Sequence, residues 1–295
     1  MEMLFCMICN LRGMHCFAMK QAKYFTISLM KGGERVATTV PQKSAFDIAG
    51  KYQVYLTWCE LGACLFSVVS TALSFFEFYA YIENSVTMIS VAFLIAICFF
   101  QMRFRSTYRE AESVRRDGLI DHCFGTIMAD TQSEGYYDSV DIDSGFKKLL
   151  ASIHESSLLS SVIVDDMLKR QERLTFIGGI FVVIACIARS IQSELLLAIL
   201  NGFLSLRLLD DYCELHALRT EIRNVLEKCK HICEDRANSR RKTFSAQQQA
   251  HLIRECIRYE CALAYASIML DEDLYQQLNP THEKAWKAIK ERYYD

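Results

Sequence analysis

The stretches Leu61–Phe76 (LGACLFSVVSTALSFF) and Val86–Met102 (VTMISVAFLIAICFFQM) decide the fold of this chain. Neither of them contains Asp, Glu, Lys or Arg. A helix needs about 20 mostly apolar residues to cross the roughly 30 Å core of a bilayer. Both stretches reach that length when their apolar flanks, Val54–Trp58 and Phe78–Tyr81, are included. The pair therefore predicts a transmembrane helical hairpin.

A second pair of uncharged stretches, Leu174–Ala188 and Leu195–Leu206, follows after a long and more polar insert. Both are shorter than an ordinary span, and buried helices of soluble domains reach the same length. We interpret them as a second hairpin because the charges around the two pairs follow the same pattern.

Basic residues gather on the outer flanks of each pair, and the connection inside the first hairpin carries Glu77 and Glu83 without a basic residue. The residues that precede the first stretch or follow the second are Lys31, Arg35, Lys43, Lys51, Arg103, Arg105, Arg109, Arg115 and Arg116. Cytoplasmic flanks of membrane helices collect Lys and Arg. We therefore expect a multi-pass membrane protein, with both termini and the insert in the cytoplasm.

The composition agrees with a mixed chain, since 52% of the residues are hydrophobic and 23% are charged. That is too apolar for an ordinary soluble domain and too polar for a protein made only of spans. The net charge of −2 gives no basic surface for nucleic acid, which is not an expected partner. With only two prolines, the chain lacks the breakers of a β protein. The expected fold is all-α, with two transmembrane hairpins and a helical cytoplasmic domain.

The predicted order has five parts: an N-terminal cytoplasmic segment (1–52), the first hairpin (53–102), a cytoplasmic helical insert (103–173), the second hairpin (174–207) and a C-terminal cytoplasmic helical domain (208–295). The sequence from Met30 onward is typical of a polar cytoplasmic segment that precedes a membrane helix. Part of Met1–Leu29 is interpreted as an over-extended gene start or a loosely ordered tail.

Within the insert we expect four segments: a charged helix over Met102–Gly118, a short buried helix over Leu119–Met128, a loop over Ala129–Gly145, and a helix over Phe146–Leu168. In the C-terminal domain, Ser245 is expected to cap a helix that ends near Leu270. The last helix is expected to begin at Asn279–Pro280, because proline suits the first helical position.

The clearest amphipathic stretch is Leu209–Cys233, whose apolar residues step by three and four. They are Leu215, Leu218, Ile222, Val225, Cys229 and Ile232. The same stretch contains Cys213, His216, Cys229, His231 and Cys233, types that can ligate zinc. Their spacing follows the helical period, so we interpret them as part of a core face.

No catalytic signature is present, since the chain lacks a Gly-rich phosphate loop, a zinc-protease helix and a nucleophile elbow. Asp138–Asp143 lacks the Gly and distal Glu of a calcium loop and is interpreted as a solvated turn. His122 and Cys123 are adjacent, so on a helix they point about 100° apart. The prediction is a protein that is not an enzyme and has no cofactor or metal.

Small and hydroxylated residues recur within the spans, at Ala63, Ser67, Ser70 and Ser74 in the first and at Ala198, Gly202 and Ser205 in the fourth. Small residues let membrane helices pack closely, and hydroxyl groups add hydrogen bonds between helices. Two interpretations stay open. The residues either pack helices together, or they line a water path in a homo-oligomer, in which case the lining residues are Ser67, Thr71, Ser74, Asn201 and Ser205.

The arrangement resembles a family of bacterial conflict-system proteins, the four-transmembrane pore-forming effectors encoded beside SMODS-type nucleotidyltransferases and similar in concept to the two-transmembrane SLATT effectors. The residues that carry the resemblance are the hairpins at Leu61–Met102 and Leu174–Leu206, the helix Arg109–Arg116 (REAESVRR), the segments Asp121–Thr126 (DHCFGT) and Gly135–Asp138 (GYYD), and the helical tail. It extends over about Pro41 to Asp295. It implies a place in the bacterial inner membrane and membrane permeabilisation in abortive infection, triggered by a nucleotide second messenger or a cytoplasmic defence protein.

The leading hypothesis is therefore a conditional pore or membrane-disrupting effector that acts on the lipid bilayer. Candidate signal-coupling residues are Arg109, Arg115, Arg116, Tyr136 and Tyr137. The first alternative is a non-catalytic membrane scaffold or sensor that recruits a cytoplasmic partner through Leu209–Cys233. A membrane enzyme without a recognisable motif and a housekeeping channel are the remaining alternatives.

Overall fold

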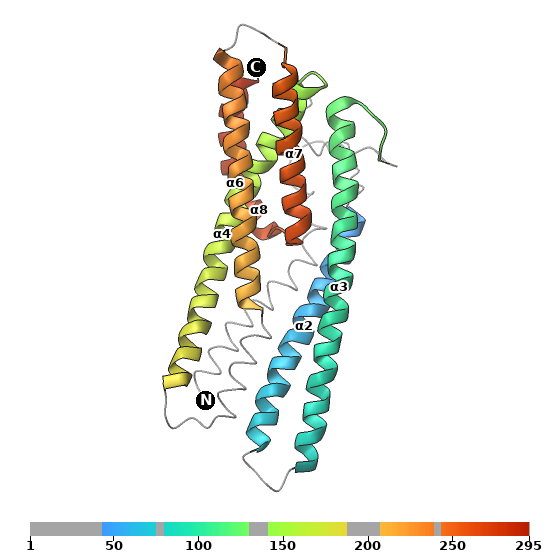
Figure 1. Cartoon of the computed structure of the whole chain (residues 1–295), viewed down its shortest axis with the longest axis vertical. Helices are drawn as coiled ribbons and strands as arrows, with labels where there is room; N and C mark the ends of the chain where they lie inside the picture. Colours follow the sequence, from blue (N-terminus) through green and yellow to red (C-terminus); the bar gives the residue numbers. More distant parts are fainter. Residues whose placement is uncertain (1–42, 75–79, 130–140, 188–206, 239–242, 295) are drawn as a thin grey trace. The chain divides into compact units, whose positions relative to one another are not determined.

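The computed structural model describes residues 43–74, 80–129, 141–187, 207–238 and 243–294 (Figure 1). These residues are almost all helical, and no strand occurs among them. The helices are α2 (Lys43–Ser74), α3 (Ala80–Phe124), α4 (Phe146–Ile187), α6 (Leu208–Asn238), α7 (Ala246–Ala266) and α8 (Glu272–Tyr293). The expected all-helical fold is confirmed for this part of the chain.

The helices belong to two compact units. Of the described residues, unit 1 contains 48–74, 80–106, 168–187 and 207–214, and unit 2 contains 43–47, 107–129, 141–167, 215–238 and 243–294. Helices α3, α4 and α6 each begin in one unit and end in the other without a break.

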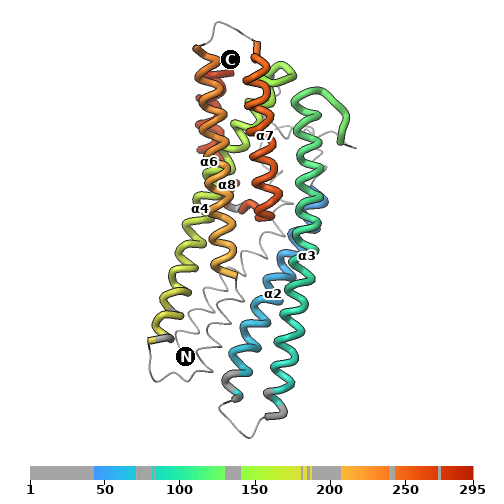
Figure 2. Tube along the Cα trace, in the orientation of Figure 1, coloured from blue at the N-terminus to red at the C-terminus, as the bar shows by residue number. Residues whose placement is uncertain are grey.

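In unit 1, α2 and α3 run antiparallel and side by side (Figures 1 and 2). Their shared core consists of Leu56, Cys59, Ala63 and Ile97, with Phe93, Ala96 and Phe100 packed against it. Both helices are long enough and apolar enough to cross a membrane, over Lys43–Ser70 and Asn84–Phe124. Within the described residues no further helix meets that criterion of length and composition. The fourth predicted stretch, Leu195–Leu206, lies outside these residues.

Unit 2 is a bundle built from parts of α3, α4 and α6 together with α7 and α8. Its core combines large apolar side chains with several cysteines. The core residues include Tyr108, Leu119, Cys123, Leu150, Ile153, Ile163, Val164, Leu218, Ile222, Val225, Cys229, Leu252, Tyr259, Leu263 and Trp286. The apolar seam predicted within Leu209–Cys233 is thus largely the face that α6 turns into this core.

The region after the first hairpin is one helix rather than two. Helix α3 continues through Met102–Gly118, as expected, but the separate short helix predicted over Leu119–Met128 is wrong because α3 runs on to Phe124. It ends at Gly125, whose φ of 68° suits glycine. The Asp121 carboxylate then accepts hydrogen bonds from Thr126 Oγ1 and from the Met128 and Ala129 amides, which fixes the exit of the chain.

The two C-terminal helices start at side-chain caps, one expected and one missed. Ser245 caps α7 in a reciprocal capping box with Gln248, as predicted. The helix ends at Ala266 instead of Leu270, because Ser267 adopts a left-handed conformation with a φ of 50°.

The predicted start of the last helix at Asn279–Pro280 is wrong. Helix α8 begins at Glu272, where the side chain of Asp271 accepts from the Leu274 amide, and Pro280 lies inside the helix. A proline in a helix interior costs about 3 kcal/mol. The cap at Asp271 and the burial of Trp286 in unit 2 act in the opposite direction.

Candidate functional site

The candidate pore-lining residues that the structure describes all lie on α2. Ser67 is half-buried there, and Thr71 and Ser74 belong to its last turns. Asn201 and Ser205 lie outside the described residues, so the structure does not bring the two halves of the predicted water path together. The water path stays a prediction.

The small residues of α2 that the structure does describe pack against α3. A Cβ atom added to Gly62 would lie 2.7 Å from the Phe93 ring, which shows how closely the helices approach. Ala63 is 3% exposed, and the hydroxyls of Ser70 and Thr87 lie 2.9 Å apart across the two helices. At these positions the packing interpretation agrees with the structure.

The outward surface of this hairpin is apolar. On α3, Met88, Ile95 and Met102 are spaced by seven residues and are 70%, 67% and 62% exposed. Residues seven apart lie on one side of a helix. Only 11% of the most apolar part of α3 and 17% of that of α2 is buried. Apolar helices in the core of a soluble protein are mostly buried, so this surface requires a covering of its own.

Helix α4 carries a similar surface where it enters unit 1. Phe176, Ile177 and Ile187 are all more than half exposed, as are Val183 and Ile184. This part of α4 coincides with the third predicted stretch, Leu174–Ala188. It continues directly from the helix predicted over Phe146–Leu168, because no turn separates the two.

The signal-coupling candidates on α3 differ in their surroundings. Arg109 is exposed and Arg116 is half-buried, whereas Arg115 is only 8% exposed. Tyr136 and Tyr137 lie outside the described residues. Glu112 lies four residues before Arg116, but it forms its ion pair with Arg115, inside unit 2.

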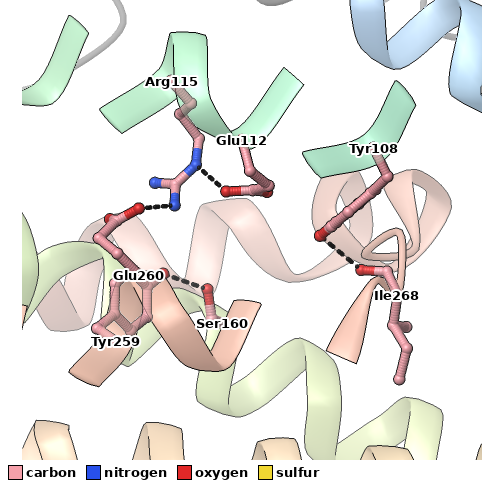
Figure 3. Close-up of polar contacts among 7 residues, drawn as sticks. All are labelled: Tyr108, Glu112, Arg115, Ser160, Tyr259, Glu260 and Ile268. Carbon is pink, nitrogen blue, oxygen red and sulfur yellow. Dashed lines mark hydrogen bonds and ion pairs between the residues drawn. The ribbon is translucent and has the colours of Figure 1, made fainter. Parts of the chain in front are cut away.

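Arg115 lies between two buried carboxylates (Figure 3). Its Nε atom is 2.8 Å from Glu112 on the same helix, and its Nη2 atom is 2.5 Å from Glu260 on α7. Glu112 and Glu260 are 3% and 4% exposed. One guanidinium thus offsets two carboxylates, and burial raises the pKa of Glu260 despite the nearby Arg115.

Neutral hydrogen bonds surround this ion cluster and tie three helices together (Figure 3). Tyr108 on α3 donates its hydroxyl to the Ile268 carbonyl over 3.0 Å. The hydroxyls of Ser160 on α4 and Tyr259 on α7 lie 2.9 Å apart. The cluster therefore fixes the position of α3 relative to α7 and α4 within unit 2.

A second buried polar group joins α4, α6 and the end of α8. His154 Nδ1 lies 3.1 Å from the Tyr294 hydroxyl and 3.7 Å from Cys233 Sγ, and the His154 ring meets Trp286 edge-on. Burial lowers the pKa of His154 to about 4 and raises the pKa of Cys233 to about 11. Burial thus disfavours the charged form of both side chains, including the thiolate that a nucleophilic cysteine needs. His154, Cys233, Trp286 and Tyr294 pack together inside unit 2.

The sequence missed this group because His154 and Cys233 lie far apart in the chain. The predicted core face is correct for Cys229 and Cys233, which are buried. It is wrong for Cys213, His216 and His231, which are exposed. The helical period brings Leu215 and Leu218 onto the buried face and turns the other three residues outward. No group of three metal-ligating side chains occurs among the described residues.

In the comparisons with known proteins, no family model, curated protein or solved structure matches the chain. Fold and site together define a protein whose described residues form an all-helical fold and include two helices that could cross a membrane. A buried ion cluster lies inside unit 2, where the C-terminal part of α3 contacts α7.

Proposed function

We propose that the chain is a conditional membrane-disrupting or pore-forming effector of bacterial antiphage defence, triggered by a cytoplasmic partner or a nucleotide second messenger. The observation that carries the membrane part is the exposed apolar surface of α3 at Met88, Ile95 and Met102. A surface of this kind is stable in lipid and is an aggregation hazard in water. The defence role is supported by the architectural resemblance drawn from the sequence.

In this proposal the protein lies in the inner membrane with both termini and unit 2 in the cytoplasm. Helix α3 is the link between signal and membrane, because it carries both the exposed apolar surface and Arg115. Arg115 acts as a positioning residue that holds α3 against α7 through Glu260. Arg109 and Arg116 lie on either side of it on the same helix and stay candidates for receiving the signal.

A matched pair of substitutions tests the membrane placement. Ile95→Asp puts a charge on the proposed lipid face, whereas Ile253→Asp puts one on an exposed apolar position of α7 in unit 2. An acidic residue at the centre of a membrane helix opposes insertion by about 2.5–3.5 kcal/mol. We expect carbonate washing to release the Ile95 variant and to leave the Ile253 variant and the wild type in the membrane. Equal release of all three would refute the membrane placement.

The pore activity is tested in a bacterium with a membrane-potential dye, with and without the genes that neighbour this one. We expect depolarisation and growth arrest only when the trigger is present. Ser74→Leu and Asn201→Leu should abolish depolarisation but leave insertion unchanged if these side chains line water. An intact membrane potential at equal expression, with the trigger present, would refute the pore activity.

The second candidate function is a membrane scaffold or sensor, and one observation favours it. Helix α7 exposes Ile253, Ile257 and Tyr265, the last of which is 84% exposed. The apolar seam of α6 is buried in unit 2, so a scaffold would recruit its partner through α7. An intact membrane potential in the presence of the trigger, with the protein stably inserted, would favour this function.

A further inference from the structure

The first turn of α6 is held to its neighbours by a group of polar contacts inside unit 1. The Leu208 carbonyl accepts hydrogen bonds from Gln171 Nε2 over 3.0 Å and from Thr175 Oγ1 over 3.1 Å. The two donors are four residues apart on α4, so they lie on one face of that helix. Both bonds form together only in one register of α4 against α6.

An ion pair joins the same turn to the first hairpin. Arg105 Nη2 on α3 lies 3.0 Å from Glu214 Oε1 on α6, and the two side chains are 39% and 31% exposed. Asp211 lies 3.8 Å from Arg207, and Glu60 of α2 is within electrostatic range of both. Within the described part of unit 1, α3 and α4 therefore contact this turn directly, and Glu60 of α2 lies close enough to interact with its charges.

Two features make these contacts easy to release. Ion pairs between partly exposed side chains contribute little to stability. Arg207 has a φ of 49°, a left-handed conformation that is unfavourable for a residue other than glycine. Such a conformation persists only where the surrounding contacts hold it in place. Loss of the contacts would let Arg207 relax, so the strain favours the open state.

We infer that the first turn of α6 is a releasable clasp, formed by Arg105, Glu214 and the two hydrogen bonds from α4 to Leu208. The clasp holds the first turn of α6 against α3 and α4 at rest. Its opening is the regulatory step that lets the start of α6 move away from these two helices. The consequence for leakage rests on the proposed function, whereas the clasp itself is a structural link that can be measured separately.

A charge-swap cycle tests the clasp in the full chain. Arg105→Glu, Glu214→Arg and the double variant are reconstituted in dye-loaded vesicles of phosphatidylethanolamine and phosphatidylglycerol. Arg103→Glu is the matched control, because Arg103 is an exposed residue of α3 that stacks on Phe99. The first measurement is the thermal midpoint of the reconstituted protein, and the second is the rate of dye release.

We expect each single variant to lower the midpoint and to raise dye release by about tenfold, because the partner is left beside a like charge. The double variant should return both quantities close to those of the wild type, and the control should change neither. If the decreases in thermal midpoint of the two single variants simply add in the double variant, Arg105 and Glu214 do not interact. That result would refute the clasp, whatever the rate of dye release. Restored midpoints with no dye release from any variant would support the clasp and count against the proposed pore.

Discussion

Units 1 and 2 differ in which side chains they expose and which they bury. Unit 1 exposes large apolar side chains such as Ile95 and Phe176, both 67% exposed. Unit 2 buries charged ones such as Glu112 and Arg115, which are 3% and 8% exposed. Buried charges require partners, and exposed apolar surfaces require a covering. The two units therefore differ in what their side chains require, and in our proposal unit 1 meets this requirement in lipid and unit 2 in water.

Each unit is also held together differently. The α2–α3 pair of unit 1 relies on close approach at Gly62 and on ring contacts such as Phe66 with Phe93, whose centroids lie 5.6 Å apart. In our proposal unit 1 lies in lipid, where the hydrophobic effect does not drive helices together and close packing takes its place. Unit 2 has an apolar core of the ordinary kind and adds the ion cluster around Arg115.

The largest expected effect comes from removing the cation of that cluster. Arg115→Met leaves Glu112 and Glu260 buried without their partner, so we expect the free energy of unfolding to fall by about 3–5 kcal/mol. The measurement is denaturant unfolding of the full chain in detergent. Arg109→Met is the control on the same helix, and since Arg109 is exposed, a change within about 0.5 kcal/mol is expected.

A rescue variant keeps this prediction decisive if Arg115→Met does not fold. Combining it with Glu112→Gln and Glu260→Gln removes the stranded charges, so much of the lost stability should return. If Arg115→Met alone is as stable as the wild type, the prediction is wrong. The carboxylates of Glu112 and Glu260 would then need no partner inside unit 2, and the contrast with unit 1 would not hold.

The second prediction concerns acid and His154. Its pKa is about 4 in the folded state because the imidazole is buried, with the charge of Lys230 as a smaller cause, and near 6.5 when unfolded. Between these values the unfolded chain binds the additional proton, so stability is lost as the pH falls from 6.5 to 4. The loss is at most about 3 kcal/mol.

The measurement is the free energy of unfolding at pH 7 and at pH 4.5, for the wild type and for His154→Gln. Other acidic groups also titrate near the lower pH, so the difference between the two proteins isolates His154. The variant should lose less stability than the wild type over this range. Equal losses would mean that His154 takes up its proton in the folded state, against its burial among Tyr294, Trp286 and Cys233.

The helical fold and the two apolar helices could be read from the sequence because the signals are local. The uncharged stretches Leu61–Phe76 and Val86–Met102 predict the apolar parts of α2 and α3. Ser245, a residue that often caps helices, predicts the start of α7. The start of α8 was misplaced because Pro280 is a strong local signal. The cap that decides the boundary, at Asp271, is a common residue with no special context in the sequence.

The ion cluster could not be read from the sequence, because it depends on contacts between distant segments. Arg115 lies among several arginines, and nothing local distinguishes it from Arg109 or Arg116. Its partner Glu260 lies on a different helix, α7. His154 and Cys233 likewise lie on two different helices, α4 and α6. The sequence indicated that α6 has a buried face, but which helices cover that face follows only from the packing.

The third prediction tests the close approach in unit 1. Gly62→Val would drive side-chain atoms into the Phe93 ring, so the α2–α3 pair should lose about 1–3 kcal/mol. Gly179→Val on α4 is the matched control, because nothing lies within 4 Å of a Cβ atom at that position. Unfolding in mixed detergent micelles measures both. A Gly62 variant as stable as the control would show that unit 1 does not depend on this contact.

The smallest expected effect concerns the hydroxyl pair between α2 and α3. Ser70→Ala removes the contact with Thr87, which lies 2.9 Å away, and a hydrogen bond between membrane helices contributes about 0.6 kcal/mol on average. Ser90→Ala is the control, since the Ser90 hydroxyl donates to the Val86 carbonyl of its own helix over 3.1 Å.

The same unfolding measurement should therefore show a loss for Ser70→Ala and a smaller change for Ser90→Ala. This small difference separates the two interpretations of the polar residues in α2. A hydroxyl that packs helices together lowers stability when it is removed, whereas a hydroxyl that faces a water path does not. Equal stability of both variants, combined with altered conductance for Ser70→Ala, would extend the water path to the face of α2 that the structure places against α3.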